Sequence, residues 1–277
     1  MSALGPLLSF RISVDYPNNP GVLRDVSLEI QPGDIVGLVG ESGSGKSTIA
    51  LALLRLLALK GAKVSGEVLF EGEDLLKKPE REIRRIRGRR MSIVLQSPLT
   101  SLNPALRIGT QLSEAWKAHA KQGQAQCEEA IRAALRSARL PDDEEFLRRR
   151  PSELSVGQGQ RVNIAMAILH RPALLIADEA TSALDTITQS EILSLFAELN
   201  RELKMAVLYI SHDLPSVAAL CQRVAIVYKG GIVESGTSDA IFTNPKHPYT
   251  QRLLSAIPLQ RARKPNGSAC DEENVCR

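Results

Sequence analysis

The sequence predicts an α/β fold in which a parallel core sheet is joined by an antiparallel patch from the N-terminal strands. Five short apolar runs are separated by helical patterns, which is typical of buried parallel strands; they cover residues 34–40, 91–96, 173–178, 206–211 and 223–228. Apolar and polar residues alternate over residues 9–14 and 26–30, which indicates strands with one solvated face. A glycine-rich loop follows the first apolar run directly, at residues 40–48.

Length and composition fit a globular protein with a substantial core, because the chain has 277 residues and 43% of them are hydrophobic. The formal net charge of +4 does not by itself require a nucleic-acid partner. No apolar run approaches the roughly 20 residues that cross a bilayer, since Arg55 interrupts the best candidate, residues 49–59. The N-terminus lacks the features of a secretory signal, so we expect the chain to stay in the cytoplasm.

The glycine-rich loop reads “GESGSGKST” at residues 40–48, after a predicted strand at 35–39 and before a predicted helix at 49–59. Its glycines allow backbone N–H groups to point at the phosphates of a nucleotide, helped by the dipole of the following helix. Lys46 adds a positive charge near the β and γ phosphates, and Ser47 adds a hydroxyl for Mg²⁺.

Polar side chains follow three of the other predicted strands. Asp178 ends the third apolar run, where it can hold Mg²⁺ through water, and Glu179 follows it as the candidate general base. Gln96 ends the second run and His212 follows the fourth. Because parallel strands bring their carboxyl ends to one edge, we expect both side chains to reach a γ-phosphate.

A second helix start suited to phosphate lies about a hundred residues later, in “ELSVGQGQRVNIAMAIL” at residues 153–169. Small polar residues and glycines precede an apolar helix there, and unpaired N–H groups at such a start bind anions. Residues 111–149 carry helical patterns with charged faces, which predicts a helical region inserted between the strands.

These motifs occur in the order seen in ATP-binding-cassette ATPases, which the chain resembles over about residues 6–258; the matching stretches are “GESGSGKST”, Gln96, “LSVGQGQR”, “LLIADEA”, “SALD” and “SHD”. The resemblance implies a P-loop NTPase (RecA-like) core with an N-terminal antiparallel β subdomain. It also implies an inserted α-helical subdomain at about residues 97–170, within a nucleotide-binding domain that spans residues 1–241. Two such subunits pack head to tail, so that the second helix start of each chain closes the ATP site of the other.

The resemblance also assigns roles to single residues. Tyr16 is expected to stack on adenine, and Asp185 lies in the loop that crosses the dimer interface. The implied catalytic residues are Glu179, His212 and Gln96, and the implied Mg²⁺ ligands are Ser47, Gln96 and Asp178. Contacts to ATP are implied for Tyr16, Gly40, Glu41, Ser42, Gly43, Ser44, Gly45, Lys46, Ser47, Thr48, Asp178, Ser155, Gly157, Gln158 and Asp185.

Val156 departs from the family pattern, which has glycine at this position of “LSVGQ”. If the backbone there needs a positive φ, a β-branched residue is strained, and ATP bound to the partner would turn over slowly. If the valine points away from the site, the replacement costs little. We favour the second interpretation, because Ser155 and Gly157 are still present.

The stretch “FTNPKHPYTQRLLSAIP” at residues 242–258, together with “SPLTSLNP”, resembles the peptide and nickel importers of the family. That resemblance implies a C-terminal extension at 242–277, a second and unlike ATPase subunit, two membrane permease subunits and an extracytoplasmic binding protein. The chain would lie at the cytoplasmic face of the membrane. We expect His247 to pack rather than to bind a metal. The transported substrate never contacts this subunit, so the sequence does not distinguish peptides from Ni²⁺.

The cysteines do not form a recognisable ligand set. Cys127, Cys221, Cys270 and Cys276 are widely scattered, which favours reduced thiols. Some peptide-type relatives hold an iron–sulfur cluster in a cysteine-rich C-terminal extension, but only Cys270 and Cys276 lie in this one. We expect the last 17 residues to be poorly ordered.

Two other functions are compatible with parts of the sequence. Residues 77–90 include eight basic and two acidic residues, a patch that a nucleic-acid-associated ATPase could use on phosphates. The segment has no aromatic residues, however, and Ile83 and Ile86 indicate an amphipathic helix that rests on the domain. A regulatory protein that binds ATP without cleaving it is the third class, and the presence of Glu179 and His212 argues against it.

Overall fold

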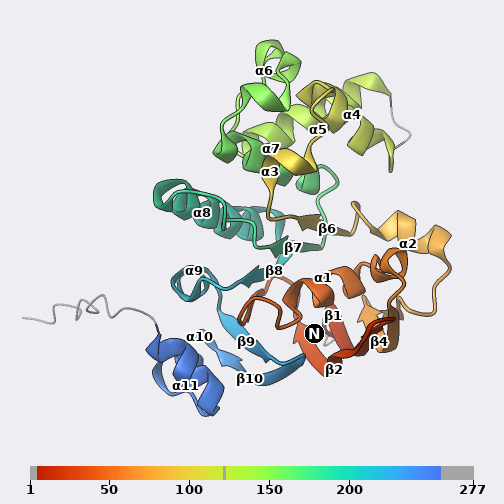
Figure 1. The fold of residues 1–277 in the computed structure, drawn as a ribbon. Coiled ribbons are helices and arrows are strands. Elements are labelled where there is room, and N and C mark those ends of the chain that lie inside the picture. Colours follow the sequence, from red (N-terminus) through yellow and green to blue (C-terminus); the bar gives the residue numbers. More distant parts are fainter. Residues whose placement is uncertain (1–4, 121–122, 257–277) are drawn as a thin grey trace, which may run out of the picture.

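The computed structural model describes residues 5–120 and 123–256, so the predictions for the last residues, including Cys270 and Cys276, lie outside the described part. Two sheets make up the lower part of the molecule in Figure 1, and a group of helices lies above them. The six-stranded sheet has the order β10-β9-β3-β8-β7-β6, and the four-stranded sheet has the order β2-β1-β4-β5.

The five predicted core strands all form and pair in parallel. They are β3 (Ile35–Val39), β6 (Met91–Val94), β7 (Leu174–Asp178), β8 (Ala206–Ser211) and β9 (Arg223–Tyr228), with β10 (Gly231–Thr237) antiparallel to β9. One strand boundary was predicted wrongly: β6 ends at Val94, so Gln96 lies two residues beyond the strand. The chain turns there into the short helix α3 (Pro98–Ser101), whose first residue is a proline that donates no ladder hydrogen bond.

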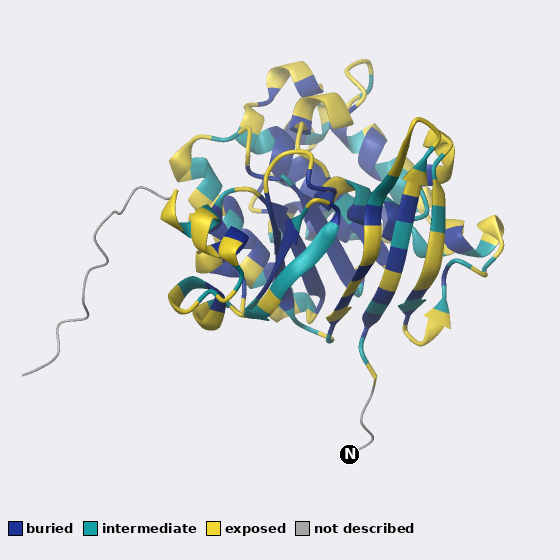
Figure 2. Cartoon of the chain, turned by 60° about the horizontal axis from the view of Figure 1, so that its bottom comes forward, coloured by how far each residue is buried: buried dark blue, intermediate teal, exposed yellow. Residues whose placement is uncertain are grey.

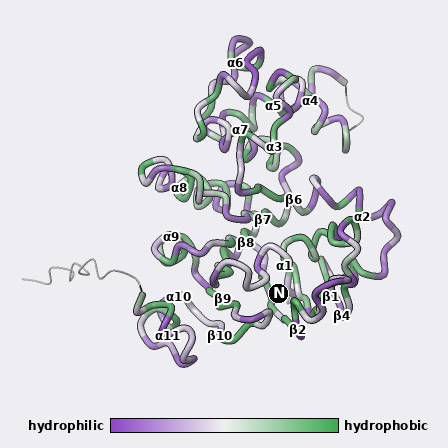
Figure 3. The backbone as a smooth tube through the Cα atoms, viewed as in Figure 1, coloured by the Kyte–Doolittle hydropathy of each residue, from purple (hydrophilic) through white to green (hydrophobic). Residues whose placement is uncertain are grey.

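The core sheet separates two hydrophobic cores, because successive side chains of a strand point to opposite faces. In β8, Val207 and Tyr209 belong to one core, and Leu208 and Ile210 belong to the other. The first core lies under the upper helices, and the second lies against the four-stranded sheet and α1. Figure 3 shows hydrophobic residues along the central strands and hydrophilic ones at α6.

The antiparallel sheet confirms the alternation in the N-terminal sequence; it consists of β1 (Leu8–Tyr16), β2 (Asn19–Ile30), β4 (Lys63–Phe70) and β5 (Glu73–Asp74). Phe10 pairs with Leu28 and Ile12 with Val26, and all four side chains are buried. Figure 2 shows buried and exposed residues alternating along these strands.

The predicted helix at 49–59 is shorter than expected. Helix α1 (Lys46–Leu53) is followed by a separate 3-10 turn, η1 (Leu57–Lys60). Arg55 adopts a left-handed φ of 52°, which ends the helix, and its guanidinium donates to the backbone carbonyls of Leu75 and Lys78. The bonds to a distant loop therefore outweigh the helix propensity of this apolar run.

The upper helices agree with the predicted helical region: they are α4 (Ile108–Lys117), α5 (Gln124–Ser137), α6 (Glu144–Arg148) and α7 (Val156–Ile168), the last preceded by the 3-10 turn η2 (Pro151–Glu153). The amphipathic helix predicted within 77–90 is α2 (Glu80–Ile86), with Ile83 buried and Ile86 partly buried. The remaining helices are α8 (Thr186–Leu203), α9 (Leu214–Leu220), α10 (Ser238–Thr243) and α11 (Pro248–Ser255). Among the described helices, none is both long and apolar enough to cross a membrane.

Candidate nucleotide site

The glycine-rich loop connects β3, a central strand of the core sheet, to the N-terminus of α1. Gly45 has a φ of 106°, and a Cβ there would lie 2.5 Å from Leu23 Cδ2, so only glycine fits. No side chain caps α1, and the first N–H groups of a helix have no acceptor within the helix. The start of α1 therefore offers several N–H groups to an anion.

Lys46 is buried in this loop and held by the loop itself. Its Nζ donates to the carbonyl oxygens of Gly40 at 2.7 Å and Glu41 at 2.9 Å. Burial lowers the pKa of the ammonium group, while the carboxylates of Glu179, Asp178 and Glu41 act in the opposite direction. A buried cation with only neutral hydrogen-bond acceptors is ready to bind an anionic ligand.

Ser44 gives an independent indication that the loop fits phosphate. Its Oγ is buried and has no hydrogen-bond partner among the described residues. A buried hydroxyl without a partner is costly, and a phosphate oxygen in the loop would satisfy it. The residues present therefore fit the phosphates of a nucleotide.

Ser47 and Asp178 meet where β7 ends beside α1. The Ser47 hydroxyl donates to Asp178 Oδ1 at 3.0 Å. Burial raises the pKa of Asp178, and the Glu179 carboxylate adds to the increase, while the bond from Ser47 and the charge of Lys46 oppose it. A hydroxyl and a carboxylate are oxygen ligands of the kind that Mg²⁺ takes together with substrate phosphates. Gln96 lies exposed on the loop before α3, and no hydrogen bond within the described part joins it to these two residues.

Glu179 and His212 form a pair, as their positions after β7 and β8 predict. His212 Nδ1 lies 2.8 Å from Glu179 Oε2. Glu179 has a left-handed φ of 53°, and its N–H donates to the carbonyl of Ile210 in the neighbouring strand at 2.9 Å. The carboxylate and the imidazole thus come from the ends of two neighbouring parallel strands.

The second helix start is the N-terminus of α7. Ser155 Oγ accepts from the Gln158 N–H and Gln158 Oε1 accepts from the Ser155 N–H, both at 3.1 Å, which is a capping box. Val156 is the first helical residue, so its backbone is right-handed, and it is 42% exposed. The favoured interpretation is thus supported, because no positive φ is needed at this position.

Asp185 caps α8 at a place next to the start of α7. Its carboxylate accepts from the N–H groups of Ile187 and Thr188 and from the Thr188 hydroxyl. These bonds, the one from the Thr188 hydroxyl first, lower the pKa of Asp185. The two helix starts are close, because a Cβ at Gly157 would lie 2.8 Å from Thr188 Cγ2.

Tyr16 ends β1 and is half-buried. The structure brings its hairpin to the phosphate loop through β2, since Leu23 and the Val22 carbonyl are the nearest neighbours of Gly45. Tyr16 thus lies on β1, and the neighbouring strand β2 contacts the phosphate loop. This position is compatible with a contact between Tyr16 and the base of a nucleotide.

Two residues of α7 matter for the site, although no separate role was predicted for them. Gln160 Nε2 donates to the carbonyl of Ala180 at 2.6 Å, directly after Glu179. Asn163 Nδ2 donates to the carbonyl of Pro98 at 2.9 Å, shortly after Gln96. Gln160 lies in the “LSVGQGQR” stretch, but no sequence pattern indicates that it bonds the carbonyl of Ala180. Through these bonds α7 is joined to the loops that carry Glu179 and Gln96.

His247 is the N-cap residue of α11. Its Nδ1 accepts from the Tyr249 N–H at 3.1 Å at the start of α11. Cys127 and Cys221 are buried free thiols. Within the described residues, no group of three or more His, Cys, Asp or Glu side chains is arranged to hold a metal ion.

Five of the eight basic residues of segment 77–90 form ion pairs with nearby carboxylates, while Arg81, Arg85 and Arg89 form none within the described residues. Arg87 donates to Glu80 at 2.6 Å, and Lys78 pairs with Glu73 at 2.8 Å and with Glu82 at 3.0 Å. The ion pairs reduce the free positive charge of the segment, but three exposed arginines remain, so charge alone does not exclude nucleic-acid phosphates.

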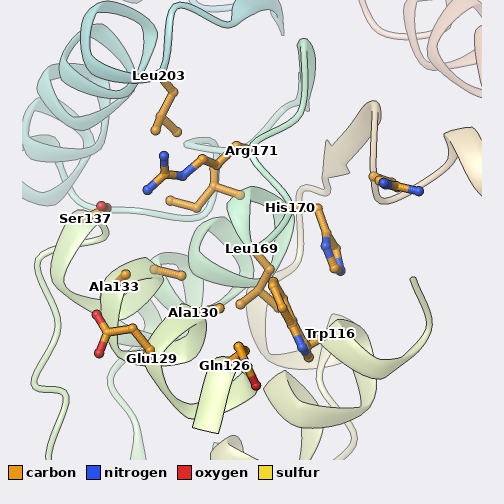
Figure 4. Close-up of a pocket in the computed structure, with 13 residues that line it drawn as sticks. Trp116, Gln126, Glu129, Ala130, Ala133, Ser137, Leu169, His170, Arg171 and Leu203 are labelled. Atoms are coloured by element: carbon orange, nitrogen blue, oxygen red, sulfur yellow. The ribbon is translucent and has the colours of Figure 1, made fainter. Parts of the chain in front are cut away.

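A cavity of about 500 Å³ lies apart from all of these residues, between α5 and the end of α7. Figure 4 shows residues that line it: Ala130, Ala133 and Ser137 belong to α5, and Leu169 and His170 follow α7, where the His170 ring stacks on Trp116. None of the predicted site residues lines it.

Comparisons with known proteins agree with this geometry. Residues 23–182 match the family described as ABC transporter, and residues 233–274 match the oligopeptide/dipeptide transporter C-terminal region. The chain is 44% identical, over 86% of its length and 72% of the other protein, to the probable peptide ABC transporter ATP-binding protein y4tR of Sinorhizobium fredii. It is 42% identical, over 92% of its length and 76% of the other, to the oligopeptide transport ATP-binding protein OppD of Escherichia coli. A dimeric ATP-binding cassette, MJ0796, solved in a post-hydrolysis state with ADP and phosphate, has a TM-score of 0.71 and 26% identity, covering 83% of this chain and 98% of that one.

Proposed function

Since the chain belongs to the ABC transporter family, we propose that it is the subunit whose ATP hydrolysis drives peptide import through a separate membrane permease. The chain is an ATPase of that family and uses ATP with Mg²⁺. One observation carries the choice of peptides: residues 233–274 match the C-terminal region of oligopeptide and dipeptide transporters. The similarity to ATP-binding proteins of peptide transporters argues against a nucleic-acid function.

We assign the chain's own catalytic half-site as follows. Lys46 leaves its two carbonyl acceptors and binds the β and γ phosphates, and Tyr16 stacks on the base. Ser47 and Asp178, whose Oγ and Oδ1 atoms lie 3.0 Å apart, would hold Mg²⁺, which would neutralise charge on the phosphates. The Glu179 carboxylate orients and deprotonates the attacking water, and His212 beside it contacts the γ-phosphate.

The start of α7 serves the nucleotide of a partner subunit. Ser155 and Gly157 carry the hydroxyl and N–H groups that would face the partner's γ-phosphate. Gln158 bonds Ser155 in the capping box and so positions it, and Asp185 lies nearby at the start of α8. The support is that the first residues of α7 are solvent-accessible in the single chain, while the phosphate loop lies at the start of a different helix. The partner subunit is an unlike ATPase of the same family.

The permease side of the molecule is a groove of about 380 Å³ between β6 and the helices α4 and α7. Leu95, next to Gln96, lines it and is exposed, and Leu99 is exposed nearby. Apolar side chains at an accessible groove suit an inserted helix of a partner. Two permease subunits, fed by an extracytoplasmic binding protein, would hold this chain at the cytoplasmic face of the membrane.

We keep the division of the chain that the family resemblance implies. Residues 1–241 would form the nucleotide-binding domain, with the helical subdomain at about 97–170, and residues 242–277 the C-terminal extension. The grouping of α3 to α7 in the upper part of Figure 1 supports the subdomain boundary.

The test is reconstitution with the membrane partners. The chain is co-expressed with its unlike ATPase partner, the two permease subunits and the binding protein, and the purified complex is placed in lipid vesicles. We expect ATP-dependent uptake of labelled peptide, loss of uptake in Lys46→Ala, and no uptake of radioactive nickel. ATPase activity that RNA stimulates, in a chain that no permease binds, would overturn the proposal.

A further inference from the structure

The C-terminal helix α11 is connected directly to the phosphate loop. The N–H of Glu41 donates to the hydroxyl of Tyr249 at 3.2 Å, across 208 positions of sequence. Tyr249 is only 3% exposed, so this is an interior contact. In Figure 1, α10 and α11 lie beside the β9–β10 edge of the core sheet.

The bond acts on a peptide unit that Lys46 also holds. The N–H of Glu41 and the C=O of Gly40 belong to the same planar peptide, and that C=O accepts from Lys46 Nζ at 2.7 Å. The peptide is therefore held at both ends, by the ammonium group on one side and by the phenol on the other. Space on the loop is also tight, since a Cβ at Gly40 would lie 2.2 Å from the carbonyl oxygen of Val227.

Tyr249 is itself held rigidly. Its ring stacks on Tyr228, the last residue of β9, with centroids 3.9 Å apart. The Glu234 carboxylate on β10 accepts from the N–H groups of Lys246 and His247 at 2.7 and 3.0 Å. His247 then accepts from the N–H of Tyr249. The start of α11 is thus anchored to the edge of the core sheet next to the loop.

We propose that Tyr249 is a positioning residue for nucleotide binding, which keeps the Gly40–Glu41 peptide in its binding orientation after Lys46 has moved to the phosphates. The proposal rests on the phosphate role assigned to the loop above. In the structure, Lys46 and Tyr249 both hold this peptide. Once Lys46 bonds a phosphate instead of Gly40, the phenol is the side chain that fixes this peptide, so the C-terminal region contributes to nucleotide affinity.

The experiment compares substitutions of the two stacked tyrosines, Tyr249 and Tyr228. Tyr249→Phe removes the hydroxyl and keeps both rings. Tyr228→Phe is the matched control, because no hydrogen bond of its hydroxyl is seen within the described residues. With the purified full-length chain, dissociation constants for Mg²⁺-ATP and for ADP are measured by calorimetry, and the thermal midpoint is measured without nucleotide.

We expect Tyr249→Phe to weaken ATP and ADP binding about two- to tenfold, the range of one hydrogen bond, while Tyr228→Phe binds like the parent chain. Without nucleotide, Tyr249→Phe should lower the thermal midpoint by no more than about 2–4 °C, as expected for the loss of one hydrogen bond, and Tyr228→Phe should not change it. Unchanged affinity in Tyr249→Phe would overturn the proposal, and so would a drop in the midpoint alone, which marks a purely structural role.

Two further variants separate this inference from the proposed function. Lys46→Ala tests the phosphate site itself: if it binds ATP normally, the proposed site is wrong, whatever Tyr249 does. Glu41→Pro removes the N–H donor, so Tyr249→Phe should have no additional effect on affinity in that background. A full additional effect there would show that the phenol acts through another group and would overturn the inference.

Discussion

At the scale of single residues, the Glu179 side chain combines the features that water activation needs. It follows Asp178, so it lies next to the proposed Mg²⁺ ligand, and it meets His212 at 2.8 Å. Its left-handed φ of 53° is uncommon for a residue other than glycine, and it occurs directly after the last residue of the regular strand β7. Backbone strain at a reactive carboxylate is the pattern expected where function outweighs local stability.

Replacement of Glu179 by Gln should stop hydrolysis without removing binding. The amide has the same shape and the same backbone tolerance, but it cannot accept the proton of water. We expect the ATPase rate of the assembled transporter to fall by about 10²–10⁴-fold, with Mg²⁺-ATP affinity unchanged. Steady-state phosphate release and equilibrium ATP binding measure the two quantities. A variant that hydrolyses ATP at the parent rate would remove Glu179 from the role of general base.

The Asp178 carboxylate should lower the stability of the chain without nucleotide, although Mg²⁺ binding requires it. Its raised pKa means that the folded chain binds the proton more tightly than the unfolded chain does. The carboxyl group therefore stabilises the fold below the ordinary Asp pKa, and this contribution is lost as the pH rises through the raised value. At neutral pH, the buried carboxylate is a net cost to the nucleotide-free chain.

Asp178→Asn should thus be more stable than the parent chain when no nucleotide is present, by on the order of 1 kcal/mol, or about 2–4 °C in thermal midpoint. It should also lose most of the extra stability that Mg²⁺-ATP gives the parent, which is about 2.7 kcal/mol at 100 times the dissociation constant. Thermal unfolding with and without Mg²⁺-ATP checks both. A variant less stable than the parent without ligand would contradict the assigned charge state.

At the scale of elements, α7 connects three parts of the site. Its first turn presents Ser155, and further along Gln160 bonds the carbonyl of Ala180 and Asn163 bonds that of Pro98. A movement of α7 would therefore displace the loops that carry Glu179 and Gln96. Its position relative to α8 is set by Gly157, where an added Cβ would approach Thr188 Cγ2 to 2.8 Å.

Gly157→Ala should separate the two helix starts. The methyl group and Thr188 would need to move from 2.8 Å to at least the 3.4 Å of ordinary contact. A displacement approaching 1 Å can cost about 100-fold in rate, so we expect the assembled transporter to lose about tenfold or more of its ATPase rate. ATP binding by the single chain should be unchanged. Val156→Gly is the control, because Val156 is exposed and has a right-handed backbone conformation. The ATPase rate of this variant should equal that of the parent. If the Val156→Gly variant hydrolyses ATP faster than the parent, valine at this position slows the hydrolysis of ATP bound to the partner.

The sequence was sufficient for elements whose signal is local. The five core strands are short apolar runs, and Glu179 and His212 meet because parallel strands end at one edge. It was insufficient where the partner is distant in sequence. Arg55 ends α1 early through bonds to carbonyls 20 and 23 positions away, and the donor to the Tyr249 hydroxyl is 208 positions away. Periodicity contains no information on such pairs.

At the scale of the whole molecule, one chain carries two phosphate-binding ends that belong to different parts of the fold. Lys46 lies at the start of α1 on the core sheet, and Ser155 at the start of α7 in the helical region (Figure 1). The motifs predicted each end separately from its own residues. Whether the ends meet depends on a second subunit, which no local pattern describes.

This arrangement predicts a specific dependence of pairing on the two ends. With saturating Mg²⁺-ATP, the Glu179→Gln chain should pair with a second ATPase subunit, either a copy of itself or its unlike partner, and light scattering should show a doubled mass. Adding Lys46→Ala should abolish both ATP binding and pairing, because the ammonium group holds the nucleotide that joins the subunits. Adding Ser155→Ala should abolish pairing but leave ATP binding by the single chain intact, because the Ser155 hydroxyl faces only the partner's nucleotide. If the Ser155→Ala chain loses its own ATP affinity, the two ends serve one nucleotide in one chain, and the head-to-tail arrangement is wrong.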